Sequence, residues 1–473
     1  MTTANHPLTN TPQASVDTDV LVVGGGPVGM LVAAELALQG AEVVLAETRT
    51  EPDERPRAGT VHARALSLLA RRGYLPSRTP EEIAHDPHGI VRTRFQFAAE
   101  PVLTISAPSV EPAPIAGIPQ ARLEVAFEDR AAALGARILR GHTVTALSAG
   151  PGAVLAEVAE HSGGRSLRIR ARYVVGADGA RGLVARTGDF PATTFPATMN
   201  AIAALAVAER PGEIPPGWHA TPTGWTMHNP NPFGAARIIA MDFSGPLGRR
   251  PEPTEAEYRR RLAHVLGAEP ALGAVTHTTR FSDHGRFRTR LRDGRLLLAG
   301  DAAHSHYPLG GQGLNTGMQD AFALGWRLAA VLAGRADPGV LDDYSRERVA
   351  VAAAVVGNTV LQSRMMNPRD PDLRDAVLAM LAVPAVHDAV AELISGQFQP
   401  GFQHDLVVTG PDGTVTTLAG LLRAGRFVAI RPDEHTPVPD APADALVVTG
   451  KVTPDQVWTT AVIRPDGYLA ATR

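Results

Sequence analysis

The sequence predicts an α/β protein built in three parts. A short apolar run, a glycine-rich turn, a helix and a second apolar run follow one another within the first 50 residues, which is the pattern of a parallel βαβ unit. From about Thr198 to His284, apolar strand-like runs instead alternate with loops rich in proline and glycine. After Pro371 the chain changes again, to short strands and tight turns. These three textures indicate three structural units.

The first unit begins with its most regular segments. Asp19 to Gly25 is apolar after its first residue and predicts a central parallel strand. Pro27 to Gln39 predicts a helix that Gly40 ends, and Ala41 to Glu47 predicts the second strand.

Later segments repeat these two patterns. Strands are predicted at 168–175 and 295–299, and helices in the second half of 57–73, at 125–134, at 254–266, at 314–332 and at 341–366. The helix at 254–266 opens with Thr254 and Glu257, the spacing of a capping box.

Composition excludes several kinds of chemistry. The chain has 473 residues, 44% hydrophobic and 20% charged, with a formal net charge of −3. Such a charge gives no attraction for nucleic acid or an anionic membrane, and no apolar run reaches the ~18 residues of a membrane span. The absence of cysteine excludes thiolate catalysis and disulfides, so redox chemistry requires a bound cofactor. The polar segment 1–17 lacks the apolar core of a secretion signal, and we expect a disordered tail on a cytoplasmic protein.

The glycine-rich turn carries the first functional motif. Gly24, Gly26 and Gly29 fit G-x-G-x-x-G between a strand and a helix, and Glu47 ends the next strand. In this context the glycines let the backbone approach a pyrophosphate at the helix N-terminus, and the acid binds a ribose hydroxyl. The alternative, an ordinary tight turn, does not account for Glu47.

A second stretch, "LLLAGDAAHSHYPLGGQGLNTGMQDA" (296–321), points at the same ligand. Asp301 follows a buried strand, where α/β folds bind ligands. The loop after it leads into a long helix, whose N-terminus stabilises negative charge such as that of a reduced flavin. His304 and His306 stand two residues apart without a carboxylate pattern, so we predict no metal site.

These motifs together resemble the single-component FAD-dependent aromatic hydroxylases of the para-hydroxybenzoate hydroxylase type. "GGGPVG" with Glu47, "VVGADGAR" (174–181) and the 296–321 stretch match in order and spacing. The resemblance covers about 18–370 and is closest to the branch that hydroxylates polyketides and antibiotics. The ending "VIRPDGYLAATR" is similar to the thioredoxin-like C-terminal domain of larger members, although without cysteine it cannot carry out dithiol chemistry.

The resemblance implies a domain organisation. A discontinuous Rossmann-like FAD domain would comprise 18–75, 100–190 and 275–370. A middle domain with a mixed sheet would comprise 76–99 and 191–274 and cover the substrate. The thioredoxin-like C-terminal domain would comprise 371–473, and the whole would be a monomer or homodimer.

The resemblance also implies roles for individual residues. Glu47 would bind the adenosine ribose, Asp301 the ribityl chain, and Asp178 both FAD and a nicotinamide cofactor. The full set of implied FAD contacts is Gly24, Gly26, Val28, Gly29, Glu47, Arg57, Gln120, the Val144 backbone, Asp178, Asp301, Gly313, Leu314 and Asn315.

The sequence departs from the family at two places near these residues. Gly182 stands where the family usually has serine after "ADGAR". Tyr307-Pro308-Leu309 replaces the commoner proline-rich triplet beside the flavin ring.

The substrate side is less defined by the sequence. Trp225, Met227 and Pro308 are candidates for lining the substrate cavity, with plain hydrophobic core as the alternative for the first two. His228 and Tyr307 are candidates for the catalytic base, and deprotonation of a phenol through water is the alternative.

The implied reaction is oxygenation of an electron-rich aromatic small molecule. NADPH or NADH would reduce FAD, and O2 would form a C4a-hydroperoxide that hydroxylates the ring, while the protein positions and shields the reactants. Baeyer–Villiger oxygenation or antibiotic inactivation would use the same chemistry. A flavin halogenase is disfavoured because no Trp-x-Trp-x-Ile-Pro segment occurs. A protein that holds FAD and a ligand without catalysis is the alternative from another class.

Overall fold

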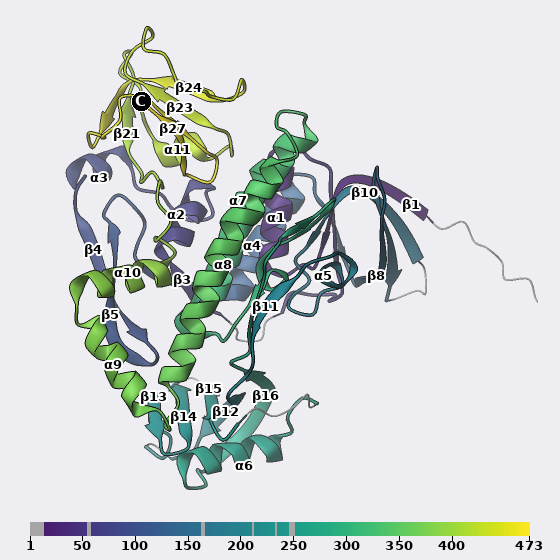
Figure 1. The fold of residues 1–473 in the computed structure, drawn as a ribbon, viewed down its shortest axis with the longest axis vertical. Coiled ribbons are helices and arrows are strands. Elements are labelled where there is room, and N and C mark those ends of the chain that lie inside the picture. Colours follow the sequence, from purple (N-terminus) through teal and green to yellow (C-terminus); the bar gives the residue numbers. More distant parts are fainter. Residues whose placement is uncertain (1–13, 54–57, 162–165, 211, 232–233, 246–250) are drawn as a thin grey trace, which may run out of the picture.

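The computed structural model describes residues 14–53, 58–161, 166–210, 212–231, 234–245 and 251–473. Figure 1 shows the C-terminal strands at one end of the molecule and a sheet covered by a single helix at the other, with two long helices between them. The chain is an α/β protein with several sheets, as the sequence predicted.

The N-terminal βαβ unit is present. Strand β1 (Ala14–Val23) and strand β2 (Val43–Glu47) pair in parallel, and helix α1 (Pro27–Leu38) connects them. Val20 to Val22 and most of α1 are buried, which explains why both segments are almost purely apolar. Because β1 begins at Ala14 and pairs with β10 from there, the expected disordered tail of 1–17 is at least four residues shorter.

The first sheet has its strands in the order β18-β19-β10-β1-β2-β7. The four strand pairs from β19 to β7 are all parallel, so the carboxyl ends of these strands lie along one edge. The other strands are β7 (Arg137–Arg140), β10 (Ser166–Gly176), β18 (Arg292–Asp293), β19 (Leu296–Leu298) and the flanking β8 (His142–Ala149) and β9 (Val154–Glu160).

Helices cover this sheet and connect it to the rest of the chain. They are α2 (Ala63–Arg71), α4 (Gln120–Ala133), α5 (Val184–Thr187), α7 (Gln312–Leu332) and α8 (Val340–Met365). The short helix α3 (Pro80–His85) instead packs through Ile83 against Val407 in the C-terminal part of the chain. Short strands complete the unit: β3 (Thr60–His62), β6 (Ile115–Gly117), β11 (Ala192–Phe195), β17 (Gly285–Arg288) and β20 (His304–Ser305).

The middle unit is a five-stranded sheet in the order β13-β14-β15-β12-β16. The strands are β12 (Asn200–Ala208), β13 (Gly217–Thr221), β14 (Gly224–Asn229), β15 (Ala236–Asp242) and β16 (Leu272–Ser282). Every pair is antiparallel. The middle sheet is therefore antiparallel, and not the mixed sheet expected from the resemblance. Helix α6 (Glu255–Leu266) covers one face, and Thr254 caps it by accepting from the Glu257 N–H.

Two predicted boundaries fall inside paired elements. Strand β4 (Ile90–Phe97) and strand β5 (Glu100–Pro108) form one hairpin, so a division between 99 and 100 separates two partners. Strand β16 pairs with β12 of the middle sheet, so this sheet continues past 274 to Ser282. A single sequence does not show which strands pair, so the bounds that the resemblance implied could not follow this pairing.

The C-terminal unit also begins later than predicted. Helices α9 (Pro371–Leu381) and α10 (Pro384–Ser395) share a hydrophobic cluster with the β4–β5 hairpin. The C-terminal sheets follow from Val407. One has the order β22-β21-β25 and the other β24-β23-β26-β27, and their elements are β21 (Val407–Thr409), β22 (Val415–Thr417), α11 (Leu418–Leu422), β23 (Val428–Arg431), β24 (Leu446–Thr449), β25 (Lys451–Thr453), β26 (Ala461–Ile463) and β27 (Leu469–Thr472).

Within the described ranges, no single helix has the length and apolarity of a membrane span. The helices α9 and α10 meet those criteria only when they are counted together across a 102° bend.

Buried arginines join the C-terminal unit to the first one. The Nε of Arg72 donates to both carboxylate oxygens of Glu35 at 3.0 Å, and its terminal nitrogens donate to the carbonyl oxygens of Leu422 and Pro465 at 2.7 and 2.9 Å. Arg72 and Glu35 are each 2% exposed. Burial raises the pKa of Glu35, and Arg72 opposes that shift. The carboxylate on the first helix therefore depends on an arginine that the C-terminal unit covers.

We predict that Arg72→Met lowers the free energy of unfolding by about 3–5 kcal/mol, because it leaves the Glu35 carboxylate buried without its cation. Chemical denaturation measures this, and Arg168→Met, at an exposed pair with Glu157, is the control with an expected change of about 0–1 kcal/mol. The double variant Glu35→Leu/Arg72→Met should recover most of the loss. Equal effects of Arg72→Met and Arg168→Met would contradict this account.

Candidate functional site

Four of the predicted cofactor contacts meet at the carboxyl edge of the first sheet. Gly24 follows β1, Glu47 ends β2, and Asp178 lies two residues after β10. Asp301 lies three residues after β19, in the 3-10 turn η1 (Gly300–Ala302). Parallel pairing therefore brings together residues that are up to 277 positions apart in the sequence.

The glycines of the first turn serve two different purposes. A β-carbon at Gly29 would lie 1.9 Å from the Gly24 carbonyl oxygen, and one at Gly24 would lie 2.5 Å from the Ala177 carbonyl oxygen. At these two positions the protein's own backbone therefore leaves no room for a side chain. A β-carbon at Gly26 would meet nothing within 4 Å. The space over Gly26 fits a pyrophosphate that approaches the N-terminus of α1.

Glu47 is fixed as an anion beside this turn. One carboxylate oxygen accepts from the Gly25 N–H at 2.6 Å, and the other accepts from the backbone N–H and Nε of Arg49 at 2.8 and 2.9 Å. Burial acts to raise the pKa of Glu47, but these hydrogen bonds outweigh it and lower the pKa. An ionised acid at this position fits a ribose hydroxyl as its ligand.

Asp178 turns back toward the chain that follows it. Its Oδ2 accepts from the Val184 N–H at 3.1 Å, its Oδ1 is buried with no partner among the described residues, and burial raises its pKa. A β-carbon at Gly182 would lie 1.9 Å from Oδ1. The departure from serine at position 182 therefore makes room for this orientation of the carboxylate.

The turn that bears Asp301 packs directly on the first helix. Gly300 has a left-handed backbone, with φ of +61°, and a β-carbon there would lie 3.1 Å from the Val28 side chain. At Gly317, on α7, a β-carbon would lie 2.6 Å from the Val28 Cγ2. Val28 thus packs against both later elements, while the Asp301 side chain faces outward and is exposed.

The N-terminus of α7 supplies uncapped backbone donors. Gly310 and Gly311 are both left-handed, with φ of +70° and +66°, and no side chain caps the helix that follows. Its first turn has no acidic residue, so its free N–H groups and dipole favour an anionic ligand. Gly313 and Leu314 lie in this turn.

Asn315 and His306 flank that turn. Asn315 accepts from the His62 N–H at 2.8 Å and donates to the Thr60 carbonyl oxygen at 2.9 Å, which joins the turn to β3. The Nδ1 of His306 lies 2.9 Å from the Tyr307 carbonyl oxygen, which can only accept. Burial lowers the pKa of His306 to about 4, so its Nε2 is an unprotonated acceptor, buried without a partner in the described chain. Such an orphaned acceptor beside free N–H donors fits a polar cofactor edge.

Three further FAD contacts were predicted, at Gln120, Val144 and Arg57. The Gln120 N–H donates to the Ala58 carbonyl oxygen at 3.0 Å. Val144 follows Thr143, whose hydroxyl donates to Thr48 beside the end of β2. Arg57 lies outside the described residues.

The substrate candidates lie on the sheet face that is turned away from α6. Trp225 and Met227 pack in one cluster with Tyr307 and Met241, and the Tyr307 hydroxyl donates to the Met241 sulfur at 2.6 Å. Trp225 donates to the Met366 carbonyl oxygen at 2.7 Å. Pro308 is exposed. The loop before α7 thus contacts the middle sheet through an apolar, methionine-rich cluster.

The two candidates for the catalytic base are not supported by their surroundings. His228 is on the same strand as Met227, but strand alternation places it on the face that α6 covers, where its Nδ1 lies 3.0 Å from the Ile214 carbonyl oxygen. Burial raises the pKa of Tyr307 well above its usual value, so the phenol keeps its proton at neutral pH.

Two groups of residues near the site were not predicted from the sequence. Asp320, within the quoted motif, is 0% exposed and forms a buried ion pair. Its position as the only acid in α7 was the available clue. Arg286 and Arg288 have no acidic partner in the part of the chain that the structure describes. Strand β17, which carries both, gave no clue in the sequence.

Comparison with known proteins decides which dinucleotide the edge accommodates. The family model described as "FAD binding domain" matches residues 17–359. The 12-dehydrotetracycline 5-monooxygenase/anhydrotetracycline 6-monooxygenase of Streptomyces rimosus is 33% identical over 490 residues, which cover 96% of this chain and 95% of the relative. The chain belongs to the FAD-dependent aromatic hydroxylase family.

One solved structure and one further relative are also similar to this flavoprotein over nearly their whole length. The solved structure of an anhydrotetracycline hydroxylase from Streptomyces rimosus superimposes with a TM-score of 0.83 at 32% identity, covering 97% of this chain and 96% of that one. A dialkyldecalin synthase of Streptomyces rugosporus is 30% identical over 466 residues, covering 95% of each chain.

We predict that Gly26→Ala and Gly29→Ala separate cofactor binding from folding. Gly26→Ala should change the stability of the FAD-free protein by less than about 0.5 kcal/mol and weaken FAD binding at least about tenfold, because only the cofactor occupies that space. Gly29→Ala should destabilise the fold itself by about 1–3 kcal/mol or more. Thermal denaturation and FAD titration measure both, and a Gly26→Ala protein with normal FAD affinity would refute the assignment.

We predict that Asp301→Ala impairs FAD retention. Losing a charge-assisted hydrogen bond to the ribityl chain should cost about 1.5–3 kcal/mol, or roughly ten- to a hundredfold in affinity. Flavin content after purification is the measurement, and Asp375→Ala, at an exposed acid on α9, is the control. Full flavin content in Asp301→Ala would show that this acid is not a ligand.

Proposed function

We propose that this flavoprotein uses NADPH or NADH and O2 to hydroxylate an electron-rich polycyclic aromatic of the polyketide or antibiotic type. The observation that carries the proposal is the convergence of Gly26, Glu47, Asp301 and the α7 N-terminus at one sheet edge. Family membership and the aromatic monooxygenases among the relatives support it. The balance is substrate, O2, NAD(P)H and a proton giving hydroxylated substrate, water and NAD(P)⁺.

The geometry supports the following FAD-binding roles as part of this proposal. Gly26 admits the pyrophosphate, Glu47 holds the ribose, and Asp301 holds the ribityl chain. The N-terminal turn of α7 and the His306 Nε2 face the polar edge of the flavin ring. When bound, FAD stores the electrons and activates O2, which no side chain of this cysteine-free chain does.

The chain's own residues position the substrate and exclude water. The cluster of Trp225, Met227, Met241 and Tyr307 offers an apolar wall, and methionine adapts to flat aromatic surfaces. Tyr307 stays protonated and fixes the loop against the sheet through its bond to the Met241 sulfur. A substrate phenol would lose its proton through water.

The nicotinamide cosubstrate would bind transiently beside Asp178. One G-x-G-x-x-G turn is present and FAD uses it, so the second dinucleotide needs other contacts. Burial and the charge of Arg288 lower the pKa of Arg286, and Arg286 and Arg288 donate to the carbonyl oxygens of Ala180 and Phe190. Two arginines without described carboxylate partners suit a dinucleotide phosphate.

The dialkyldecalin synthase among the relatives favours a second candidate function. That relative's name describes ring formation and not oxygenation, so a chain of this fold can serve as a scaffold around its ligand. The two functions differ in whether NAD(P)H is consumed when a ligand is bound.

We predict slow NAD(P)H oxidation by the protein alone and oxidation at least about tenfold faster with the right polycyclic phenol, because the transient site must be coupled to substrate binding. Arg286→Met should raise the KM for NAD(P)H roughly ten- to a hundredfold at unchanged flavin content. Arg290→Met, whose arginine is paired with Asp189 at 2.7 Å, is the control. If the bound flavin is not reduced by NADPH or NADH with any phenol of the panel, the result would favour the scaffold function.

A further inference from the structure

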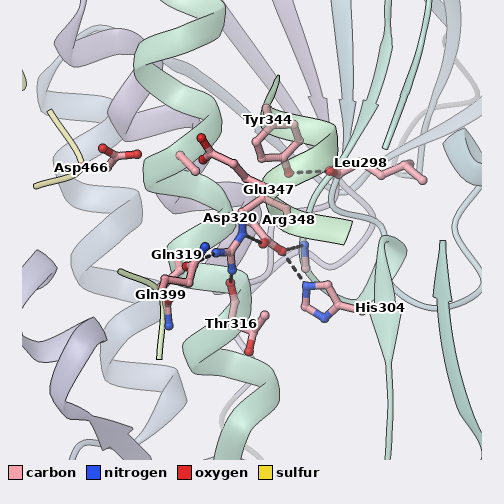
Figure 2. A network of polar contacts seen from close by, with 12 residues as sticks. Leu298, His304, Thr316, Gln319, Asp320, Tyr344, Glu347, Arg348, Gln399 and Asp466 are labelled. Carbon is pink, nitrogen blue, oxygen red and sulfur yellow. Dashed lines mark hydrogen bonds and ion pairs between the residues drawn. The ribbon is translucent and has the colours of Figure 1, made fainter. Parts of the chain in front are cut away.

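A fully buried carboxylate lies directly behind the turn that bears Asp301. Asp320 accepts at one oxygen from the Gly300 N–H at 3.0 Å and from the His304 Nε2 at 2.6 Å, and at the other from the Arg348 Nε at 2.6 Å. Figure 2 shows the side chains of His304 and Arg348 converging on it. Burial acts to raise the pKa of Asp320, but His304 and Arg348 outweigh it and lower the pKa.

The hydrogen bond from the Gly300 N–H to Asp320 fixes the orientation of the turn that carries Asp301. Gly300 has φ of +61°, and Asp301 follows it in the chain. The N–H of Gly300 is held from α7, and its Cα is packed against Val28. Rotation of the turn would break a hydrogen bond to an ionised group in a dry interior, which is among the costlier bonds to lose.

The same network reaches the C-terminal part of the chain. Arg348 donates to the Gln399 Oε1 at 3.1 Å and to the Thr316 carbonyl oxygen at 3.2 Å. The same Gln399 oxygen accepts from the Tyr468 hydroxyl at 3.2 Å. Gln399 lies after α10 and Tyr468 lies just before β27, so both come from the segment beyond the long helices.

A cavity of about 240 Å³ adjoins this connection. Its lining includes Gln319, Arg348, Gln399, Arg464, Asp466 and Tyr468. Gln399 and Tyr468 border this cavity and are half-buried, whereas Asp320 and Arg348 are 0% and 3% exposed. Changes at Gln399 and Tyr468 can alter the network without creating a hole in the core.

We propose that Asp320 is a positioning residue for the FAD-binding turn, and that the C-terminal segment acts on that turn through Gln399, Arg348 and Asp320. This rests on the proposed FAD site. It gives a cysteine-free C-terminal unit a role in cofactor binding, namely to hold Arg348 so that Asp320 keeps Gly300 and Asp301 in the orientation that the ribityl chain requires.

The test uses the full-length protein, three variants on the C-terminal side and one control variant on α8. Gln399→Met removes the shared acceptor, Tyr468→Phe removes one donor to it, and Gln399→Glu keeps an acceptor for both. Tyr344→Phe is the matched control, because it removes one buried hydrogen bond, to the Leu298 carbonyl oxygen at 2.7 Å, from the same helix as Arg348. FAD affinity of the flavin-free protein, visible circular dichroism of bound flavin and thermal stability are measured for each.

Gln399→Met should weaken FAD binding several-fold and alter the flavin dichroism, Tyr468→Phe should do so to a lesser degree, and Gln399→Glu should restore both readouts. Tyr344→Phe should lower thermal stability with FAD affinity unchanged. In an Asp320→Asn background the effect of Gln399→Met should disappear. If that background does not fold, a double Gln399→Met/Tyr468→Phe variant no weaker than Gln399→Met alone gives the same support.

Unchanged FAD affinity in Gln399→Met, or a loss equal to that in Tyr344→Phe, would overturn the proposal. So would full additivity of Gln399→Met with Asp320→Asn or with Tyr468→Phe. These outcomes are separate from failure of the proposed function. A wild-type protein that binds FAD but never oxidises NAD(P)H would remove the monooxygenase reaction and leave the positioning network standing.

Discussion

The packing of Val28 against Gly300 and Gly317 is the constraint on which the cofactor site depends. The side chain comes from the first helix of the chain, and the two glycines come from the turn and the helix that follow β19 nearly 300 residues later. A β-carbon at Gly317 would lie 2.6 Å from Val28, so any larger residue would separate the two elements. This contact sets the spacing between the residues proposed to bind the pyrophosphate and those proposed to bind the flavin.

The rest of the architecture supports that contact from both sides. The middle sheet packs against Tyr307, in the loop before α7, through an apolar cluster. On the other side, Arg72 and Arg348 place their charges in the interior, with carboxylates on α1 and α7 and carbonyl or amide oxygens from the C-terminal segment. Guanidinium groups suit this arrangement because one side chain donates to several acceptors in fixed directions. The C-terminal unit is thus part of the cofactor-binding body of the protein.

The parts of the structure that could be predicted from sequence are those with local patterns. The βαβ unit, both long helices and the strand-end placement of Glu47, Asp178 and Asp301 follow from apolar runs, glycines and the family resemblance. Boundaries at 99 and 274 failed because strand pairing is not local. His228 could not be separated from Met227 without knowing which sheet face meets the cofactor domain. The charged partners of Asp320 and Arg72, which are Arg348 and Glu35, come together only when distant helices pack. Residue-level FAD contacts stay predictions.

The measurement that tests the account most directly is the source of the oxygen in the product. The FAD-loaded protein would be incubated with NADPH and a panel of polycyclic phenols under ¹⁸O2, and products would be read by mass spectrometry. The account predicts one heavy oxygen atom in the hydroxylated product and the other in water. Product oxygen that derives from labelled water, or turnover that continues without O2, would contradict it.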